Sequence, residues 1–128
     1  MLPELVAGIE VFISLLPSEK RQHMFDYSEA ERVIRMAKDK IDAKLIIVFG
    51  SVANGTADDD SDLDMVIVKE HVENNFISGA KARLALKGSK VPIDIIIYTL
   101  EEFKKGLADE YSLAYEAMTT GRVVHGSV

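Results

Sequence analysis

The amino-acid sequence predicts an α/β (α+β) domain in which a small mixed sheet of three to four strands is flanked by helices. Two observations carry this prediction. Short runs rich in apolar and β-branched residues, which are typical of buried strands, occur at residues 44–49, 62–68 and 91–98. Around them, apolar residues recur at helical spacing. The resulting order, helix–strand–strand–helix–strand–helix, favours a small sheet covered by helices.

Composition limits the class of protein. The chain has 128 residues, of which 48% are hydrophobic and 28% are charged, enough for one folded domain with a core. We expect this domain over residues 28–128, preceded by a helical N-terminal extension over residues 1–27. The absence of cysteine excludes disulfides, thiolate catalysis and cysteine-ligated zinc. The net charge of −6 argues against nucleic acid as a partner, but leaves small polyphosphates that bind through metal ions.

The apolar N-terminal stretch does not have the layout of a targeting signal. Glu4 and Glu10 interrupt it, and no Lys or Arg precedes it, which is the reverse of the charge layout of a signal peptide. It is also too short to span a membrane, which takes about 20 apolar residues. We therefore expect no membrane association and a cytoplasmic location.

The first two helices are expected at residues 4–16 and from Ser28 onward. Residues 4–16 carry apolar side chains at helical spacing and stop near Pro17. Ser28 and Glu31 have the spacing of a capping box, in which each side chain satisfies a backbone N–H at the start of a helix. The residues behind them form an apolar stripe of Val33, Ile34, Ala37 and Ile41.

The apolar pattern then changes from helical spacing to the continuous runs that are typical of buried strands. Residues 44–49 are an unbroken apolar run that a glycine ends, and residues 62–68 are a second run. In the third, residues 91–98, Pro92 lies near the start, where a strand tolerates it. A short final strand is expected at 122–124.

Two further helices are expected between and after these strands. One, over residues 74–87, carries Phe76, Ile77, Ala80, Leu84 and Leu86. The other begins where Thr99 and Glu102 repeat the capping-box spacing. We expect it to break near Gly106 and to end at a C-cap on Gly121.

Five aspartates fall within seven residues where the second strand begins: Asp58, Asp59, Asp60, Asp62 and Asp64. In a strand, Asp62 and Asp64 would project from one face about 6–7 Å apart, while Leu63 and Met65 point into the core. Two such carboxylates repel each other, which raises the pKa of one of them. A divalent cation such as Mg²⁺ removes the conflict and brings phosphate oxygens with it.

Two other interpretations apply to such a cluster of aspartates. One is a solvated acidic loop without a ligand. The other is an EF-hand, but Leu63 stands where that loop needs glycine and Lys69 where it needs glutamate. Gly50 and Ser51 argue against a solvated loop without a ligand. They follow the first strand directly, and ten residues separate Ser51 from Asp62. A glycine lets backbone N–H groups approach a phosphate, and the serine hydroxyl adds a donor. We expect a loop or short helix over the intervening residues.

This combination resembles the signature of the polymerase-β-like nucleotidyltransferases. That signature is a hydrophobic residue, Gly and Gly or Ser, a spacer, then Asp–hydrophobic–Asp/Glu–hydrophobic. The matching residues here are Phe49, Gly50, Ser51, Asp62, Leu63, Asp64 and Met65. The resemblance covers residues 28–124 and extends to the minimal nucleotidyltransferases, which include MntA-type antitoxins that pair with HEPN-domain toxins. It implies the nucleotidyltransferase fold.

The resemblance also implies a third carboxylate on a later strand, and Asp94 is at the matching position. It is the sole charged residue of an apolar strand, where an unpaired buried carboxylate would cost several kcal/mol. A structural alternative is that Arg83 or Lys90 pairs with Asp94.

By this resemblance the protein transfers a nucleoside monophosphate, with AMP from ATP expected, from an NTP to an acceptor hydroxyl. Gly50 and Ser51 would hold the β- and γ-phosphates, and Asp62 and Asp64 would ligate two Mg²⁺ ions. Asp94 would ligate the metal that activates the acceptor and is the candidate general base.

A rival hypothesis is a catalytically weak or inactive binding module that neutralises a partner by contact. Asn54 favours it, because antitoxins of this type usually read Gly-Ser-x-Ala-Arg-Gly and Asn54 replaces the arginine. The three intact carboxylates favour the enzyme. Larger nucleotidyltransferases hold the acceptor with a second domain, for which this chain is too short. A protein partner (HEPN-like) or a homodimer is therefore expected on either hypothesis.

Overall fold

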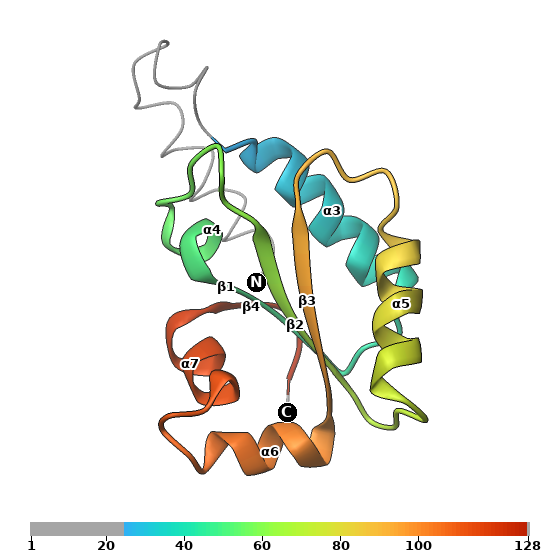
Figure 1. Ribbon diagram of the computed structural model, residues 1–128. Helices are drawn as coiled ribbons and strands as arrows, with labels where there is room; N and C mark the ends of the chain where they lie inside the picture. The colour runs from blue at the N-terminus through green and yellow to red at the C-terminus, as the bar shows by residue number, and fades with distance from the viewer. Residues whose placement is uncertain (1–24, 128) are drawn as a thin grey trace.

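The computed structural model describes residues 25–127, so the helix predicted at 4–16 lies outside the described residues. Over this range a four-stranded sheet has helices on both of its faces (Figure 1). This arrangement confirms the predicted fold class. No helix within residues 25–127 is long and apolar enough to cross a membrane.

The sheet has the strand order β3-β2-β1-β4. The central strand β1 (Leu45–Phe49) pairs antiparallel with both β2 (Leu63–Lys69) and β4 (Arg122–Gly126). Strand β2 in turn runs parallel to β3 (Ile93–Thr99) at the edge. The sheet is therefore mixed, and the short final strand expected after residue 121 is present as β4.

The helices form two layers. One face of the sheet is covered by α3 (Tyr27–Lys40), the short α4 (Gly50–Asn54) and α5 (Asn75–Ala85). The other face is covered by α6 (Leu100–Leu107) and α7 (Leu113–Thr120). The predicted break near Gly106 is the turn between α6 and α7. A side chain at Gly106 would place its Cβ 2.7 Å from that of Ala114, so a glycine lets the two helices meet closely.

Alternation along the strands explains their unbroken apolar runs. In β1, Ile46 and Val48 point into the core beneath α3, whereas Leu45 and Ile47 point into the core beneath α7. All four are fully buried. A strand covered on both faces needs apolar residues at every position, which is why the sequence period disappears there.

The start of α3 differs from the prediction. The N-cap is Asp26, whose carboxylate accepts a hydrogen bond from the Glu29 backbone N–H at 3.0 Å. The predicted Ser28–Glu31 capping box is therefore wrong by two residues. Tyr27 is 1% exposed and belongs to the first turn of α3, so the helix begins ahead of the predicted cap. The predicted Thr99–Glu102 capping box, in contrast, is present at the start of α6.

Helix α5 forms where predicted but turns its apolar stripe outward. Phe76, Ile77 and Leu84 are 83%, 50% and 70% exposed, and only Leu86 of the five predicted residues is buried. The helix faces the core through the small residues Gly79 and Ala82 instead.

Candidate active site

The candidate residues meet at one end of the sheet, where β1 ends and β2 and β3 begin. Asp64 is the register partner of Phe49 on one side and of Asp94 on the other. Neighbouring strands lie about 4.8 Å apart, so Gly50, directly after Phe49, is beside Asp64. The Leu63 backbone N–H donates to the Pro92 carbonyl at 2.8 Å, which holds the starts of β2 and β3 together.

Gly50 makes close contact with the carboxylate possible. Its φ is +73°, in the left-handed region that favours glycine, and it opens α4. A Cβ at this position would lie 2.6 Å from Oδ2 of Asp64. Ser51 follows in the first turn of α4 and is half-buried. The backbone of this turn therefore approaches the carboxylate in a way that a side chain at position 50 would prevent.

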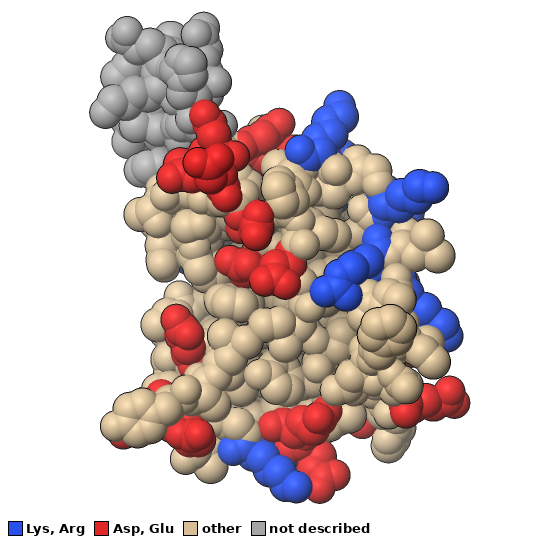
Figure 2. All heavy atoms as spheres, in the orientation of Figure 1, with Lys and Arg blue, Asp and Glu red and all other residues tan. Residues whose placement is uncertain are grey.

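The three carboxylates differ in their surroundings. Asp64 is half-buried, whereas Asp62 and Asp94 are exposed. Burial raises the pKa of Asp64, and the negative charges of Asp94 and Asp62 raise it further. The expected repulsion from Asp62 is present, but burial is the main cause of the raised pKa. Acidic side chains gather in this upper part of the molecule in Figure 2.

Asp94 is not the buried carboxylate that its apolar strand suggested. By alternation it shares a face with Ile96 and Tyr98, which pack against the α6–α7 core, but it stands near the start of β3 and is exposed. Within residues 25–127 it forms no ion pair with Arg83 or Lys90. The structural alternative, an ion pair of Asp94 with Arg83 or Lys90, is therefore not observed. Because Asp94 is exposed, the free-energy cost of burying an unpaired carboxylate does not arise.

The spacer separates the five aspartates into two groups. Asp58 accepts hydrogen bonds from the Asp60 backbone N–H at 2.9 Å and from the Ser61 hydroxyl at 3.2 Å. Asp58, Asp59 and Asp60 are exposed and form a turn with its own local bonds. Asp62 and Asp64 instead introduce and begin β2. The spacer combines the short α4 with a loop, as expected.

Two residues that support the spacer have no signal in the sequence. The Ala57 backbone N–H donates to the hydroxyl of Tyr27 at 3.1 Å, and Nε of Arg122 donates to the Ala53 carbonyl at 3.0 Å. Tyr27 falls inside the extension predicted over residues 1–27, yet it is part of the main core. Hydrogen bonds between residues so far apart in the sequence form only when the chain folds.

The donor set fits a hard divalent cation. It consists of carboxylate oxygens, and burial of Asp64, followed by the charges of Asp94 and Asp62, raises the pKa of Asp64. Among the described residues, however, no group of three His, Asp or Glu side chains lies close enough together to hold a metal ion. Such an open arrangement suits Mg²⁺, which is usually held by one or two carboxylates together with the phosphates of a substrate.

A hollow of about 590 Å³ lies at the opposite end of β2 and β3. It is lined by Glu70, His71, Val72, Thr99, Leu100, Glu101 and Lys104. None of the candidate carboxylates lines it. The hollow and the candidate carboxylates therefore lie at opposite ends of β2 and β3.

One family of proteins and several solved structures are similar to this chain. A family model described as a nucleotidyltransferase domain matches residues 30–118. A structure of the toxin–antitoxin MntA-HpeT with two aspartate-to-glutamate substitutions has a TM-score of 0.54 and 18% identity, covering 77% of this chain and 73% of that one. A tyrosine-to-alanine variant of MntA-HpeT has a TM-score of 0.51 and 20% identity, covering 75% and 71%. At these identities the likeness is one of fold. None of the curated proteins matches significantly.

Proposed function

The chain belongs to the nucleotidyltransferase domain family, and from this premise we propose that it transfers AMP from ATP to an acceptor hydroxyl. One observation carries the proposal. The register of β2 and β3 sets Asp64 beside Asp94 at the end of the sheet where β1 is followed by Gly50 and Ser51 of α4.

The triphosphate would bind at the start of α4. Gly50 has no side chain, so the oxygens of the β- and γ-phosphates can approach the backbone N–H groups of this turn. The Ser51 hydroxyl would donate one hydrogen bond to them. Mg²⁺ ions held by Asp62, Asp64 and Asp94 would neutralise charge on the phosphates and on the entering and leaving oxygens.

Asp94 would act as the general base. Its side chain is exposed, so an acceptor hydroxyl can reach it. As Asp94 takes the hydroxyl proton, the acceptor oxygen forms a bond to the α-phosphorus. The bond between the α-phosphorus and the bridging oxygen breaks, and pyrophosphate leaves with that electron pair.

The proposed acceptor is a hydroxyl on a partner protein. Asp62 and Asp94 are both exposed, which leaves the site open to a large acceptor. The structures of similar fold are those of a toxin–antitoxin, MntA-HpeT. We therefore propose an antitoxin role toward a HEPN-like toxin, with a homodimer as the alternative source of the acceptor.

A second candidate is neutralisation of a partner by contact alone. Asn54, exposed at the end of α4, favours it, because it replaces an arginine that is usual in antitoxins of this type. The two candidates differ in whether the carboxylates are needed.

The test is transfer of label from α-³²P-ATP to a co-purified partner in the presence of Mg²⁺. Asp64→Asn should abolish labelling, whereas Asp58→Asn, the same change in the turn that lies outside the site, should preserve it. Equal labelling by both variants would overturn the assigned site. An Asp64→Asn protein that still silences its partner fully would favour the contact mechanism.

A further inference from the structure

The outward face of α5 is apolar, which is the reverse of an ordinary surface helix. Phe76 and Leu84 are 83% and 70% exposed, Ile77 is 50% exposed, and Ala80 lies between them in the same stripe. An apolar stripe of this kind on a surface commonly marks a binding site. We call these four residues the α5 stripe.

The α5 stripe has a basic rim. Residues 75–87 contain Lys81, Arg83 and Lys87 and no acidic residue, in a chain whose net charge is −6. At about 100° per residue, Lys81 and Arg83 fall on opposite sides of the stripe. In Figure 2 the basic side chains run down the right-hand edge, where Figure 1 places α5. Within residues 25–127 none of the three cations forms a salt bridge, although Arg83 donates a hydrogen bond to the Ile95 carbonyl at 3.3 Å.

The rim decides which kind of segment fits the stripe. Two copies of α5 packed face to face would bring six cations together, which disfavours a second copy of this surface. A helix with an apolar face and acidic flanks would bury the stripe and also pair with the rim.

The chain itself contains such a segment. Residues 4–16 carry Leu5, Ile9, Phe12, Ile13 and Leu16 at helical spacing. Glu4 and Glu10 are their only charged residues, and no Lys or Arg occurs before Lys20. Apolar pattern and charge are thus both complementary to the α5 stripe.

The segment can also reach α5 on the same molecule. It joins the described fold at Phe25, which is buried beside α3, and α3 packs against α5. The connecting residues 17–24 can span about 26 Å when extended. The 14 residues of α3 cover about 21 Å.

We propose that residues 4–16 dock as an amphipathic helix on the α5 stripe of their own chain, with Glu4 and Glu10 facing the basic rim. This inference is independent of nucleotide transfer and assigns a role to a part of the chain that the active site does not use.

A disulfide trap tests the proposal, because the full-length chain has no cysteine of its own. Ile9→Cys combined with Leu84→Cys places one thiol on each apolar face. A disulfide requires the two Cα atoms to lie about 4.4–6.8 Å apart. Under mild oxidation at low protein concentration we expect rapid formation of an intrachain bond, seen as a mobility shift of the monomer and by mass spectrometry.

The matched control is Ser14→Cys with Leu84→Cys, because Ser14 falls on the opposite side of the same helical segment. It should close several-fold more slowly. Equal rates for the two pairs, or disulfide-linked dimers as the main product, would overturn the proposal. The second outcome would assign the stripe to another copy of the chain.

Charge reversal gives an independent readout. Glu10→Lys should slow closure of the Ile9–Leu84 cysteine pair, and Lys81→Glu added to it should restore the rate. Lys81 is exposed, so we expect circular dichroism to show an unchanged fold. No change in rate with Glu10→Lys would overturn the assigned pairing of acidic segment and basic rim.

Discussion

Asp64 is the residue at which the electrostatics of the site concentrate. Its raised pKa means that the folded state disfavours the charged form, first through burial and then through Asp94 and Asp62. Relative to the unfolded state, the protonated form of Asp64 stabilises the fold at low pH. This stabilisation is lost as pH rises through the pKa of Asp64 in the folded state. At neutral pH the metal-free protein therefore carries a destabilising charge that a bound cation would relieve.

Replacing that charge should make the apoprotein more stable. We expect Asp64→Asn to raise the melting temperature at pH 7 in EDTA, and the gain to vanish on acidification. Thermal melts at several pH values measure it. Asp58→Asn, at an exposed position that bonds only within its own turn, should shift the melting temperature less.

Gly50 offers a separate test of the close approach. Gly50→Ala should lower the free energy of unfolding by at least about 1–2 kcal/mol, the cost of a left-handed non-glycine residue. It should also push Asp64 aside and reduce transfer. Gly55→Ala is the matched control, with nearly the same φ of +74° but nothing within 4 Å of its Cβ. Urea denaturation giving equal losses for both would mean that contact with Asp64 is unimportant.

Substitution of Asp94 tests its proposed role as the general base. Because Asp94 is exposed and unpaired among the described residues, Asp94→Asn should leave the melting temperature unchanged. Transfer should fall a few hundred-fold, or about 3–4 kcal/mol of barrier, since each ~1.4 kcal/mol is tenfold. Single-turnover rates run beside melting curves measure both. A variant that labels its partner at the wild-type rate would remove Asp94 from the mechanism.

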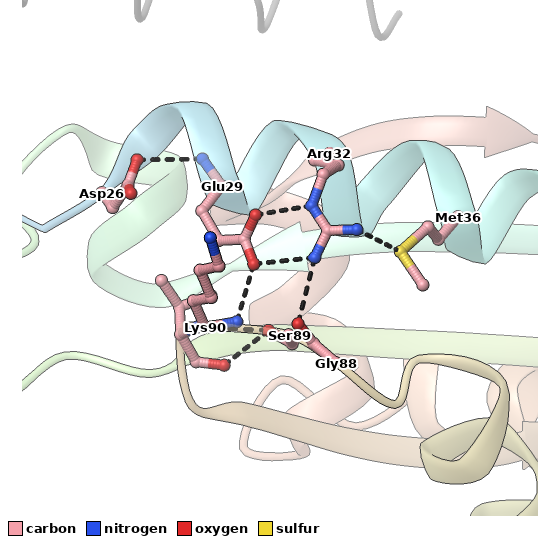
Figure 3. A network of polar contacts seen from close by, with 8 residues as sticks. Asp26, Glu29, Arg32, Met36, Gly88, Ser89 and Lys90 are labelled. Carbon is pink, nitrogen blue, oxygen red and sulfur yellow. Dashed lines mark hydrogen bonds and ion pairs between the residues drawn. The ribbon is translucent and has the colours of Figure 1, made fainter.

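At the scale of elements, α3 is clamped to the turn that leads into β3 (Figure 3). Glu29 accepts hydrogen bonds from Nε and Nη2 of Arg32 at 2.6 and 2.8 Å, and from the Lys90 backbone N–H at 2.6 Å. Arg32 also donates to the Gly88 carbonyl at 3.1 Å. The clamp fixes the start of β3, and with it the register that sets Asp94 beside Asp64.

This clamp should be sensitive to acid. The hydrogen bonds from Arg32 and then from Lys90 lower the pKa of Glu29 from its ordinary 4.5 to about 2. A lowered pKa contributes stability above pH 4.5 that is lost as pH falls toward 2. Glu29→Gln should therefore lower the melting temperature at pH 6 and flatten its decline between pH 5 and pH 2. Glu73→Gln, which replaces an exposed glutamate, is the control; the same flattening there would contradict the clamp.

At the scale of the whole molecule, the site joins segments that are far apart in the chain, so a ligand that binds there should stabilise the fold globally. At a hundred times its Kd, a ligand that binds only the folded state adds about 2.7 kcal/mol. ATP with Mg²⁺ should therefore raise the melting temperature by several degrees, and ATP with EDTA should not. Ser51→Ala should weaken binding by about 1–2 kcal/mol. An equal shift in EDTA would contradict a site built from carboxylates.

Features that depend on neighbouring residues could be predicted from the amino-acid sequence. Apolar runs located the strands, the Thr99 capping box located α6, and the break near Gly106 separated α6 from α7. The spacing of Gly50 and Ser51 from Asp62 and Asp64 identified the family. These signals are local, because a strand, a cap or a turn is specified by residues a few positions apart.

Which faces are covered followed from the tertiary structure alone. Asp94 is exposed although its strand is otherwise apolar. The α5 stripe faces outward because the helix packs on the core through Gly79 and Ala82. Tyr27 and Arg122 reach the spacer across many residues of sequence. A periodic pattern shows which side chains share a face, but the burial of that face depends on segments far away in the chain, and these only the fold brings near.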